Sequence, residues 1–139
     1  MVVLKSHKAF GSFLGRGTHV WLEIVREGGE KVTFSGAKVR RMLAVVENLK
    51  RDYDKESTRG AVVIPAPEGM GDAEWDALVI EAGRSVKASV DRRYRYSGLL
   101  HCLPDRGNCC TVVNLIIERA GGRIPRFRPQ GVAPGLSVC

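Results

Sequence analysis

Residues 108–122 read Asn-Cys-Cys-Thr-Val-Val-Asn-Leu-Ile-Ile-Glu-Arg-Ala-Gly-Gly, and this stretch decides the fold. Its apolar positions from 112 to 117 cover much of a helix circumference, so we expect a helix from about 110 to 120 near the centre of the protein. Asn108 is a good N-cap residue, and Gly121-Gly122 ends the helix. We predict an α+β fold in which a small antiparallel sheet packs against this central helix.

The sheet is expected to be built around a hairpin. Residues 18–25 alternate with His19, Trp21 and Glu23 on one face, and 31–35 returns after a turn at Gly28-Gly29. A two-residue turn pairs Glu23 with Phe34, which places Thr33 and Ser35 on the face away from His19. A register change of one residue would reverse that arrangement.

The remaining segments predict one domain over 1–139. Apolar runs at 2–4 and 61–64 are typical of strands. The segment 39–52 fits either a helix or a strand. A second helix should begin with Asp72 as its N-cap and bury a face made of Trp75, Leu78, Val79, Ala82 and Val86. The Pro- and Gly-rich residues 123–139 should form a C-terminal strap along the surface.

The composition limits the classes of function. The chain has 139 residues, a net charge of +7 and a pI of about 9.6, which favours an anionic cell-wall or membrane partner. Nucleic acid ranks last as a partner, because nothing in the sequence organises the arginines at 92–95 and 123–128. The N-terminus lacks the pattern of a secretory signal. We therefore expect cytoplasmic synthesis, with any export through a dedicated secretion system.

The four cysteines do not indicate a metal site or a disulfide framework. All lie in the last third of the chain, and Cys109 and Cys110 are too close in sequence to bridge each other easily. The spacing of His101-Cys102 from Cys109-Cys110 does not match a zinc motif. We predict no metal and no cofactor, and we expect Cys102 and Cys139 to be either structural or incidental.

The start of the helix at residue 108 is the candidate reactive position. A cysteine in a first helical turn lies at the positive end of the helix dipole, which stabilises its thiolate. Unpaired N–H groups of that turn can bind an oxyanion. Cys109 is therefore the candidate nucleophile. If the helix begins one residue later, Cys110 becomes the nucleophile and Cys109 the cap.

The candidate base is His19, because a regular strand would hold its imidazole rigidly. His7 lies near a terminus expected to be loose, and His101 lies in a Pro- and Arg-rich loop. Glu23 shares a face with His19 but stands about 13 Å along the strand, too far to orient the ring. The orienting group is thus unassigned: a backbone carbonyl takes that role, or the site works as a dyad.

The segments Gly17-Thr18-His19-Val20 and Gly107-Asn108-Cys109-Cys110-Thr111 resemble the circularly permuted papain-like hydrolases, relatives of NlpC-type peptidases and of lecithin retinol acyltransferase. The resemblance implies a permuted papain-like domain whose central helix bears the nucleophile Cys109, with His19 as base. Asn108 and Cys110 would then help to position the substrate or its oxyanion.

That resemblance implies a cysteine hydrolase that cleaves an amide bond, in a peptidoglycan peptide or an isopeptide-like substrate, through an acyl-enzyme. The Pro- and Gly-rich ending at 125–136 also resembles small bacterial effectors of this group, for which an inhibitor or a secretion carrier is the expected protein partner. A lipid-directed acyltransferase or phospholipase is one alternative. A non-catalytic binding module is the other.

Overall fold

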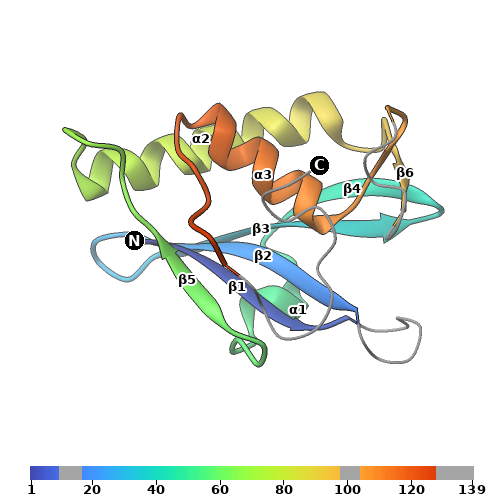
Figure 1. Ribbon diagram of the computed structural model, residues 1–139, viewed down its shortest axis with the longest axis horizontal. Coiled ribbons are helices and arrows are strands. Elements are labelled where there is room, and N and C mark those ends of the chain that lie inside the picture. Colours follow the sequence, from blue (N-terminus) through green and yellow to red (C-terminus); the bar gives the residue numbers. More distant parts are fainter. Residues whose placement is uncertain (10–16, 98–103, 128–139) are drawn as a thin grey trace.

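A single curved sheet of seven strands forms the centre of the computed structural model, which describes residues 1–9, 17–97 and 104–127 (Figure 1). The strands lie in the order β5-β1-β2-β3-β4-β6-β7. Their bounds are β1 Val2–Lys8, β2 Thr18–Val25, β3 Lys31–Val39, β4 Met42–Glu47, β5 Ala61–Ile64, β6 Arg95–Tyr96 and β7 Arg106–Gly107. All neighbouring strands are antiparallel except β6 and β7, which are parallel.

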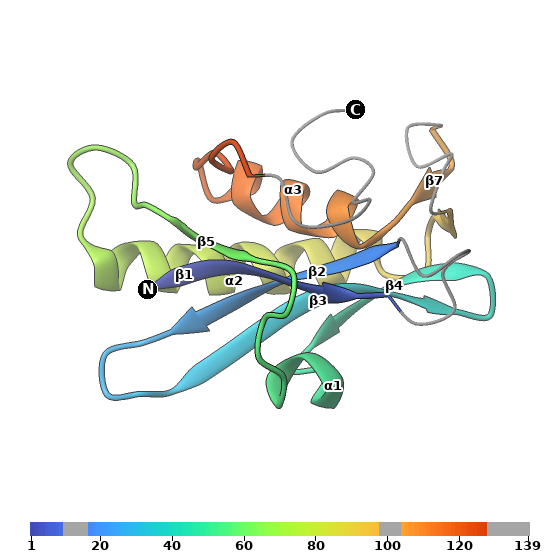
Figure 2. The same cartoon turned by 60° about the horizontal axis from the view of Figure 1, so that its bottom comes forward.

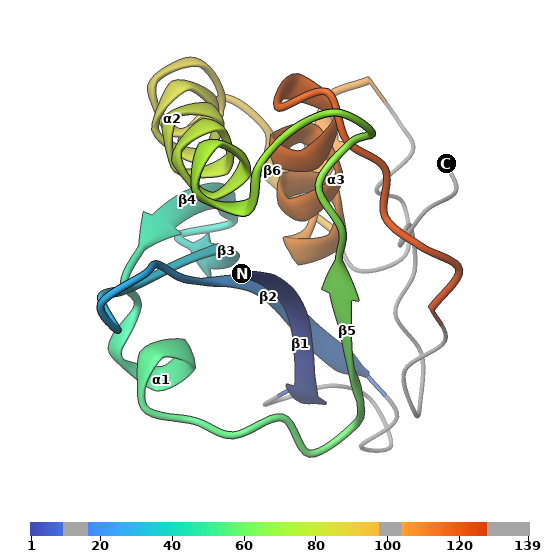
Figure 3. The same cartoon turned by 90° about the vertical axis from the view of Figure 1, so that its left-hand side faces the viewer.

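Three helices cover the two faces of this sheet. The long helix α2 (Asp72–Val90) and α3 (Cys109–Arg119) lie together on one face, and the single turn α1 (Lys50–Tyr53) lies on the other (Figures 2 and 3). Within the described ranges, none of these helices combines the length and apolarity that crossing a bilayer requires.

The predicted fold class is wrong. The sheet is neither small nor purely antiparallel: it has seven strands and ends in a parallel pair. The helix that begins at Cys109 is not a single central helix, because it shares its face of the sheet with the longer α2 (Figure 3). The error about the sheet comes partly from its edge, where β6 and β7 have two residues each and leave no periodic pattern in the sequence.

The predicted register of the β2–β3 hairpin is also wrong, by one residue. Glu23 pairs with Thr33 and Trp21 with Ser35. Arg26 donates its N–H to the carbonyl of Glu30 (2.9 Å), so the loop has three residues between them instead of two. Since neighbouring residues point to opposite faces of a sheet, this change brings Thr33 and Ser35 onto the face that carries His19.

Other predicted elements are found with small shifts. The strand alternative is correct for 42–47, and the chain then turns into α1. The N-cap of α2 is Gly71, one residue before the predicted cap. On α3, both the cap Asn108 and the stop at Gly121 are as predicted, with Gly121 in the left-handed conformation that ends many helices (φ 84°). Of the predicted strap, the structure describes only 123–127.

The helix α3 approaches the sheet closely because β3 has a glycine at the point of contact. A Cβ at Gly36 would lie 2.9 Å from the Cα of Cys109 and 2.9 Å from the Cγ2 of Val112. The first turn of α3 can therefore rest directly on the backbone of β3. The glycine fixes where the thiol of Cys109 lies relative to the sheet.

We expect Gly36→Ala to destabilise the protein by about 1–3 kcal/mol, because the added methyl group meets helix backbone that cannot move without shifting α3. Thermal and denaturant unfolding would measure this loss. Gly71→Ala is the comparison: its Cβ would meet nothing within 4 Å and its φ of −75° suits alanine, so only the smaller loss from replacing an N-cap glycine is expected. Equal stability of Gly36→Ala and the native protein would contradict the close contact.

Candidate active site

The candidate nucleophile lies where two strands separate. The pairing of β2 with β3 ends at Trp21 and Ser35, one residue before Val20 and Gly36. Cys109 occupies this opening: Gly36 faces its Cα on one side, and the backbone N–H of Val20 hydrogen-bonds its sulfur on the other. The buried thiol (4% exposed) is thus held by backbone from two strands.

His19 lies beside this thiol, as the sequence predicted for the base. Its side chain hydrogen-bonds Cys109, and its Nε2 lies 3.1 Å from Oδ2 of Asp52. Because Nε2 is engaged by the carboxylate, Nδ1 is the ring nitrogen left for the thiol. The order Cys109–His19–Asp52 is that of a nucleophile, a base and the group that orients the base.

Asp52 is the residue that sequence analysis missed. It lies on α1, with no exposed surface, and reaches the sheet from the face opposite α3. Burial raises the pKa of its carboxyl, but hydrogen bonds with His19 and His7 outweigh this effect and hold the pKa well below its usual value. Ser35 contributes in the same direction, which follows from the corrected register. Asp52 is therefore a carboxylate at neutral pH.

The electrostatics favour an ion pair between Cys109 and His19. Burial lowers the pKa of His19, but the bonds with Asp52 and Cys109 raise it to about 9. The hydrogen bond from Cys110 lowers the pKa of Cys109; burial opposes it, and the bond with His19 lowers it further, so that the net pKa is well below its usual value. Thiolate and imidazolium should therefore coexist at neutral pH.

Cys110 is distinguished from Cys109 by this arrangement. The hydrogen bond with the Cys109 sulfur raises the pKa of Cys110, and burial and the charge of Cys109 act in the same direction. Its sulfur therefore keeps its proton and donates it to Cys109. The alternative in which Cys110 is the nucleophile and Cys109 the cap has the wrong geometry, since Asn108 is the cap.

The cap of α3 leaves two backbone donors beside the thiolate. The Asn108 side chain accepts a hydrogen bond from the N–H of Thr111 (3.1 Å), and the Thr111 hydroxyl accepts one from the N–H of Asn108 (3.0 Å). The N–H of Val112 bonds the carbonyl of Asn108. Neither the N–H of Cys109 nor that of Cys110 has a carbonyl acceptor one turn back in the helix, and the N–H of Cys110 contacts its own sulfur. These two groups are the candidate donors for an oxyanion.

A second histidine completes the buried cluster, against expectation. His7 is not near a loose end, because it is buried in β1 and lies opposite His19 in the β1–β2 pair. The distance between Nε2 of His7 and Oδ1 of Asp52 is 3.5 Å. Its Nδ1 donates to the carbonyl of Lys8 (2.8 Å). The ligand atoms of His7, His19 and Asp52 lie within 4.8 Å of one another, close enough to hold a metal ion.

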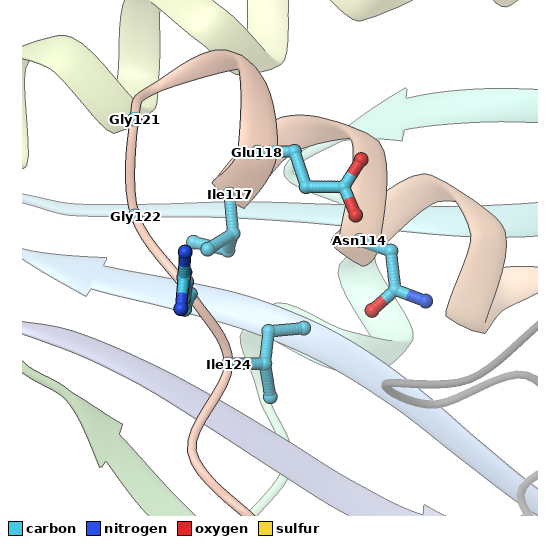
Figure 4. Close-up of a pocket in the computed structure, with 7 residues that line it drawn as sticks. Asn114, Ile117, Glu118, Gly121, Gly122 and Ile124 are labelled. Carbon is cyan, nitrogen blue, oxygen red and sulfur yellow. The ribbon is translucent and has the colours of Figure 1, made fainter.

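A pocket elsewhere on α3 does not include these groups. It lies toward the end of that helix and the segment that follows (Figure 4). Its lining is Asn114, Ile117, Glu118, Gly121, Gly122, Arg123 and Ile124. It contains no cysteine or histidine, so it offers no thiol nucleophile and no imidazole base for acyl transfer.

The sequence therefore identified three of the positions that the structure brings together, Cys109, His19 and the cap Asn108. Glu23 is excluded as the residue that orients His19 by its distance along the strand. Its carboxylate also forms an ion pair with Lys5 (Nζ to Oε1, 2.7 Å). The position of His7 beside His19 could have been predicted from the sequence. It follows if the segments before and after the Gly-rich residues 11–17 are paired as two neighbouring strands. Asp52 left no pattern. His101, Cys102 and Cys139 lie outside the described residues.

The ion pair predicts how alkylation of Cys109 depends on pH. A thiol of ordinary pKa loses about tenfold in rate for each unit of pH below it, whereas Cys109 should react with iodoacetamide at nearly the same rate at pH 6 and pH 8. Above pH 9 His19 loses its proton and the pair is lost. Mass spectrometry after timed alkylation measures this, with His19→Ala as the comparison. A rate that rises steadily from pH 6 to pH 9 would contradict the ion pair.

Cys110 provides a second test through its S–H donor. We expect Cys110→Ala to raise the pKa of Cys109, because the thiolate loses a hydrogen bond. Cys110→Ser keeps a donor and should restore the low pKa. The pH dependence of Cys109 alkylation in the two variants gives the readout. If both variants behave like the native protein, the contact between the sulfurs does not stabilise the thiolate.

The comparisons of this chain with protein-family models, with curated proteins and with solved structures find no match. The resemblance of its two short segments to the permuted papain-like hydrolases therefore stays a prediction.

Proposed function

We propose that this chain is a thiol-dependent hydrolase that works through an acyl-enzyme. The observation that carries the proposal is the buried array of Cys109, His19 and Asp52, brought from three separate elements into hydrogen-bond contact. Such an array stabilises a thiolate and supplies an acid beside it, which is what acyl transfer from an amide or ester needs.

The reaction would proceed in two halves. The Cys109 thiolate forms a bond to the substrate carbonyl carbon, and the oxyanion accepts hydrogen bonds from the N–H groups of Cys109 and Cys110. The His19 imidazolium gives its proton to the leaving amine or alkoxide as the tetrahedral species collapses. His19, now neutral, takes a proton from water, and the resulting hydroxide attacks the thioester and releases the acid. Asp52 holds the imidazole in orientation throughout.

The substrate class is also a proposal. An amide in a peptidoglycan peptide or an isopeptide-like bond is the first candidate, as the resemblance implies. A lipid ester is the second: acyl transfer to water would make the protein a phospholipase, and transfer to another acceptor an acyltransferase. Action as an antibacterial effector, exported by a dedicated system, would agree with either substrate.

A metal-dependent reaction is a competing proposal, and the cluster of His7, His19 and Asp52 supports it. Two histidines and a carboxylate are common ligands for zinc and iron. A metal at this position would take Nε2 of His19 from Asp52 and disrupt the thiol–imidazole pair. The two chemistries therefore exclude each other: added zinc should inhibit a thiol hydrolase, and a chelator should inhibit a metalloenzyme.

The test is hydrolysis of peptidoglycan fragments and phospholipid vesicles by the native protein and matched variants. Cys109→Ala should abolish turnover, and His19→Ala should lower kcat by roughly 10²–10⁴-fold. Asp52→Asn should lower kcat roughly tenfold or more, because the imidazole loses its orientation. Asp54→Asn, at the exposed end of the same helix, is the control and should keep full activity.

Full activity of Cys109→Ala would overturn the proposal, and loss of activity in a chelator would favour the metal reaction. Retained binding of a substrate without turnover, in a native protein with a reactive Cys109, would favour the binding-module alternative. That alternative drew its support from the missing orienting residue, and Asp52 weakens it.

A further inference from the structure

Basic residues from short clusters far apart in the sequence come together at one end of the sheet. We call this group the arginine edge; it consists of Lys38, Arg40, Arg41, Arg92, Arg93, Arg95 and Arg106. It carries seven basic residues, against the two acidic residues Asp91 and Asp105 in the same segments, and so holds most of the chain's net charge of +7.

Backbone hydrogen bonds fix this edge as one surface. The N–H of Tyr96 bonds the carbonyl of Arg41 (2.8 Å), and the N–H of Arg92 bonds the carbonyl of Leu43 (2.8 Å). Arg95 pairs with Met42 on one side and with Arg106 on the other. The segments that carry these arginines are far apart in the sequence but adjacent in the backbone, at the end of the sheet where the β3–β4 turn, β6 and β7 meet (Figures 1 and 2).

Three of these arginines stand where the backbone disfavours them. Arg40, Arg41 and Arg92 have φ of 47°, 69° and 57°, and the fourth non-glycine residue with positive φ in the described ranges is Asn48. The two-residue turn at Arg40-Arg41 has the backbone that favours Asn-Gly. Arginine there costs stability without a packing benefit, since both side chains are exposed. The charges at this turn therefore point to a binding role.

The arginine edge also exposes apolar surface. Val39 precedes Arg40 and Tyr94 lies between Arg93 and Arg95, and each is 36% exposed. They are two of the four large hydrophobic residues that are exposed in the described part of the chain. Tyrosine beside arginine is a typical combination at membrane–water interfaces, where the ring enters the headgroup layer and the cations meet phosphate.

The edge is continuous with the candidate active site. Tyr96 pairs with Gly107, two residues before Cys109. Burial raises the pKa of Tyr96, and the negative charge of the Cys109 thiolate raises it further, so the ring lies within electrostatic reach of that thiolate. A substrate held at the edge would lie next to the first turn of α3.

We propose that the arginine edge docks the protein on an anionic phospholipid bilayer, which brings the first turn of α3 close to the lipid surface. The exposed Tyr94 and Val39 favour a bilayer over a nucleic acid or another soluble polyanion, which would meet the charges without needing the apolar side chains. This docking rests on charge and exposed surface alone, so it does not require the thiol chemistry proposed above.

The test is binding of the full chain to sedimented vesicles of phosphatidylcholine with or without phosphatidylglycerol. The variant R40N/R41G removes two charges and gives the turn its favoured residues. We expect this variant to bind anionic vesicles roughly 30-fold more weakly, since each arginine contributes about a factor of five near the surface. Its midpoint of thermal unfolding should rise, because the strain is relieved. Tyr94→Ser should weaken vesicle binding several-fold.

The control R26Q/R84Q removes the same charge from exposed arginines outside the edge and should bind as the native chain does. Cys109→Ala should also bind normally, which separates docking from catalysis. Equal binding to neutral and anionic vesicles, or native affinity in R40N/R41G, would overturn the proposal. So would tighter binding to a DNA duplex than to vesicles, with no effect of Tyr94→Ser.

Discussion

The buried carboxylate of Asp52 is the interaction on which the site depends. A charge without solvent must be paired with donors, because an isolated buried carboxylate would cost far more than the fold can supply. His19 donates to one oxygen of the carboxylate from β2, and Arg51 donates to the other from the same helix turn as Asp52. His7, on the neighbouring strand β1, lies 3.5 Å from that second oxygen. The paired charge keeps His19 protonated, and a protonated His19 in turn keeps Cys109 ionised. One contact therefore sets the protonation state of the whole array.

That contact depends on the register of the β2–β3 hairpin. The three-residue loop after Arg26 puts Ser35 opposite Trp21, on the face where Asp52 approaches. With a two-residue loop the same strands would turn Thr33 and Ser35 into the apolar side, and the carboxylate would face Phe34 instead. The two glycines at positive φ, Gly28 and Gly29, allow the longer loop. A single residue in an exposed turn thus decides which side chains surround His19, the candidate base.

The sequence predicted the parts of the site that depend on local pattern. A cap followed by an apolar helix places Cys109 at the start of α3, and strand alternation places His19 on one face of β2. The parts that depend on long-range packing could not be predicted. Asp52 meets His19 across 33 residues, and the two-residue strands β6 and β7 exist only through their pairing with β4 and with each other. Neither feature has a periodicity, so the size of the sheet and the third member of the array were missed.

The two surfaces of functional interest share one property: each departs from what stability alone would favour. A buried carboxylate is rarely better for stability than an apolar side chain of similar size, and Arg40-Arg41 occupies a turn better suited to Asn-Gly. Elsewhere the chain follows local rules, with apolar residues under α2 and α3, a capping box at Asn108 and a glycine after Ala120. At most positions of a folded chain, the local preference of the residue agrees with the fold. Positions where that preference is overridden are therefore the first candidates for a binding or catalytic role. Here both lie at the same end of the sheet, joined through Tyr96 and Gly107.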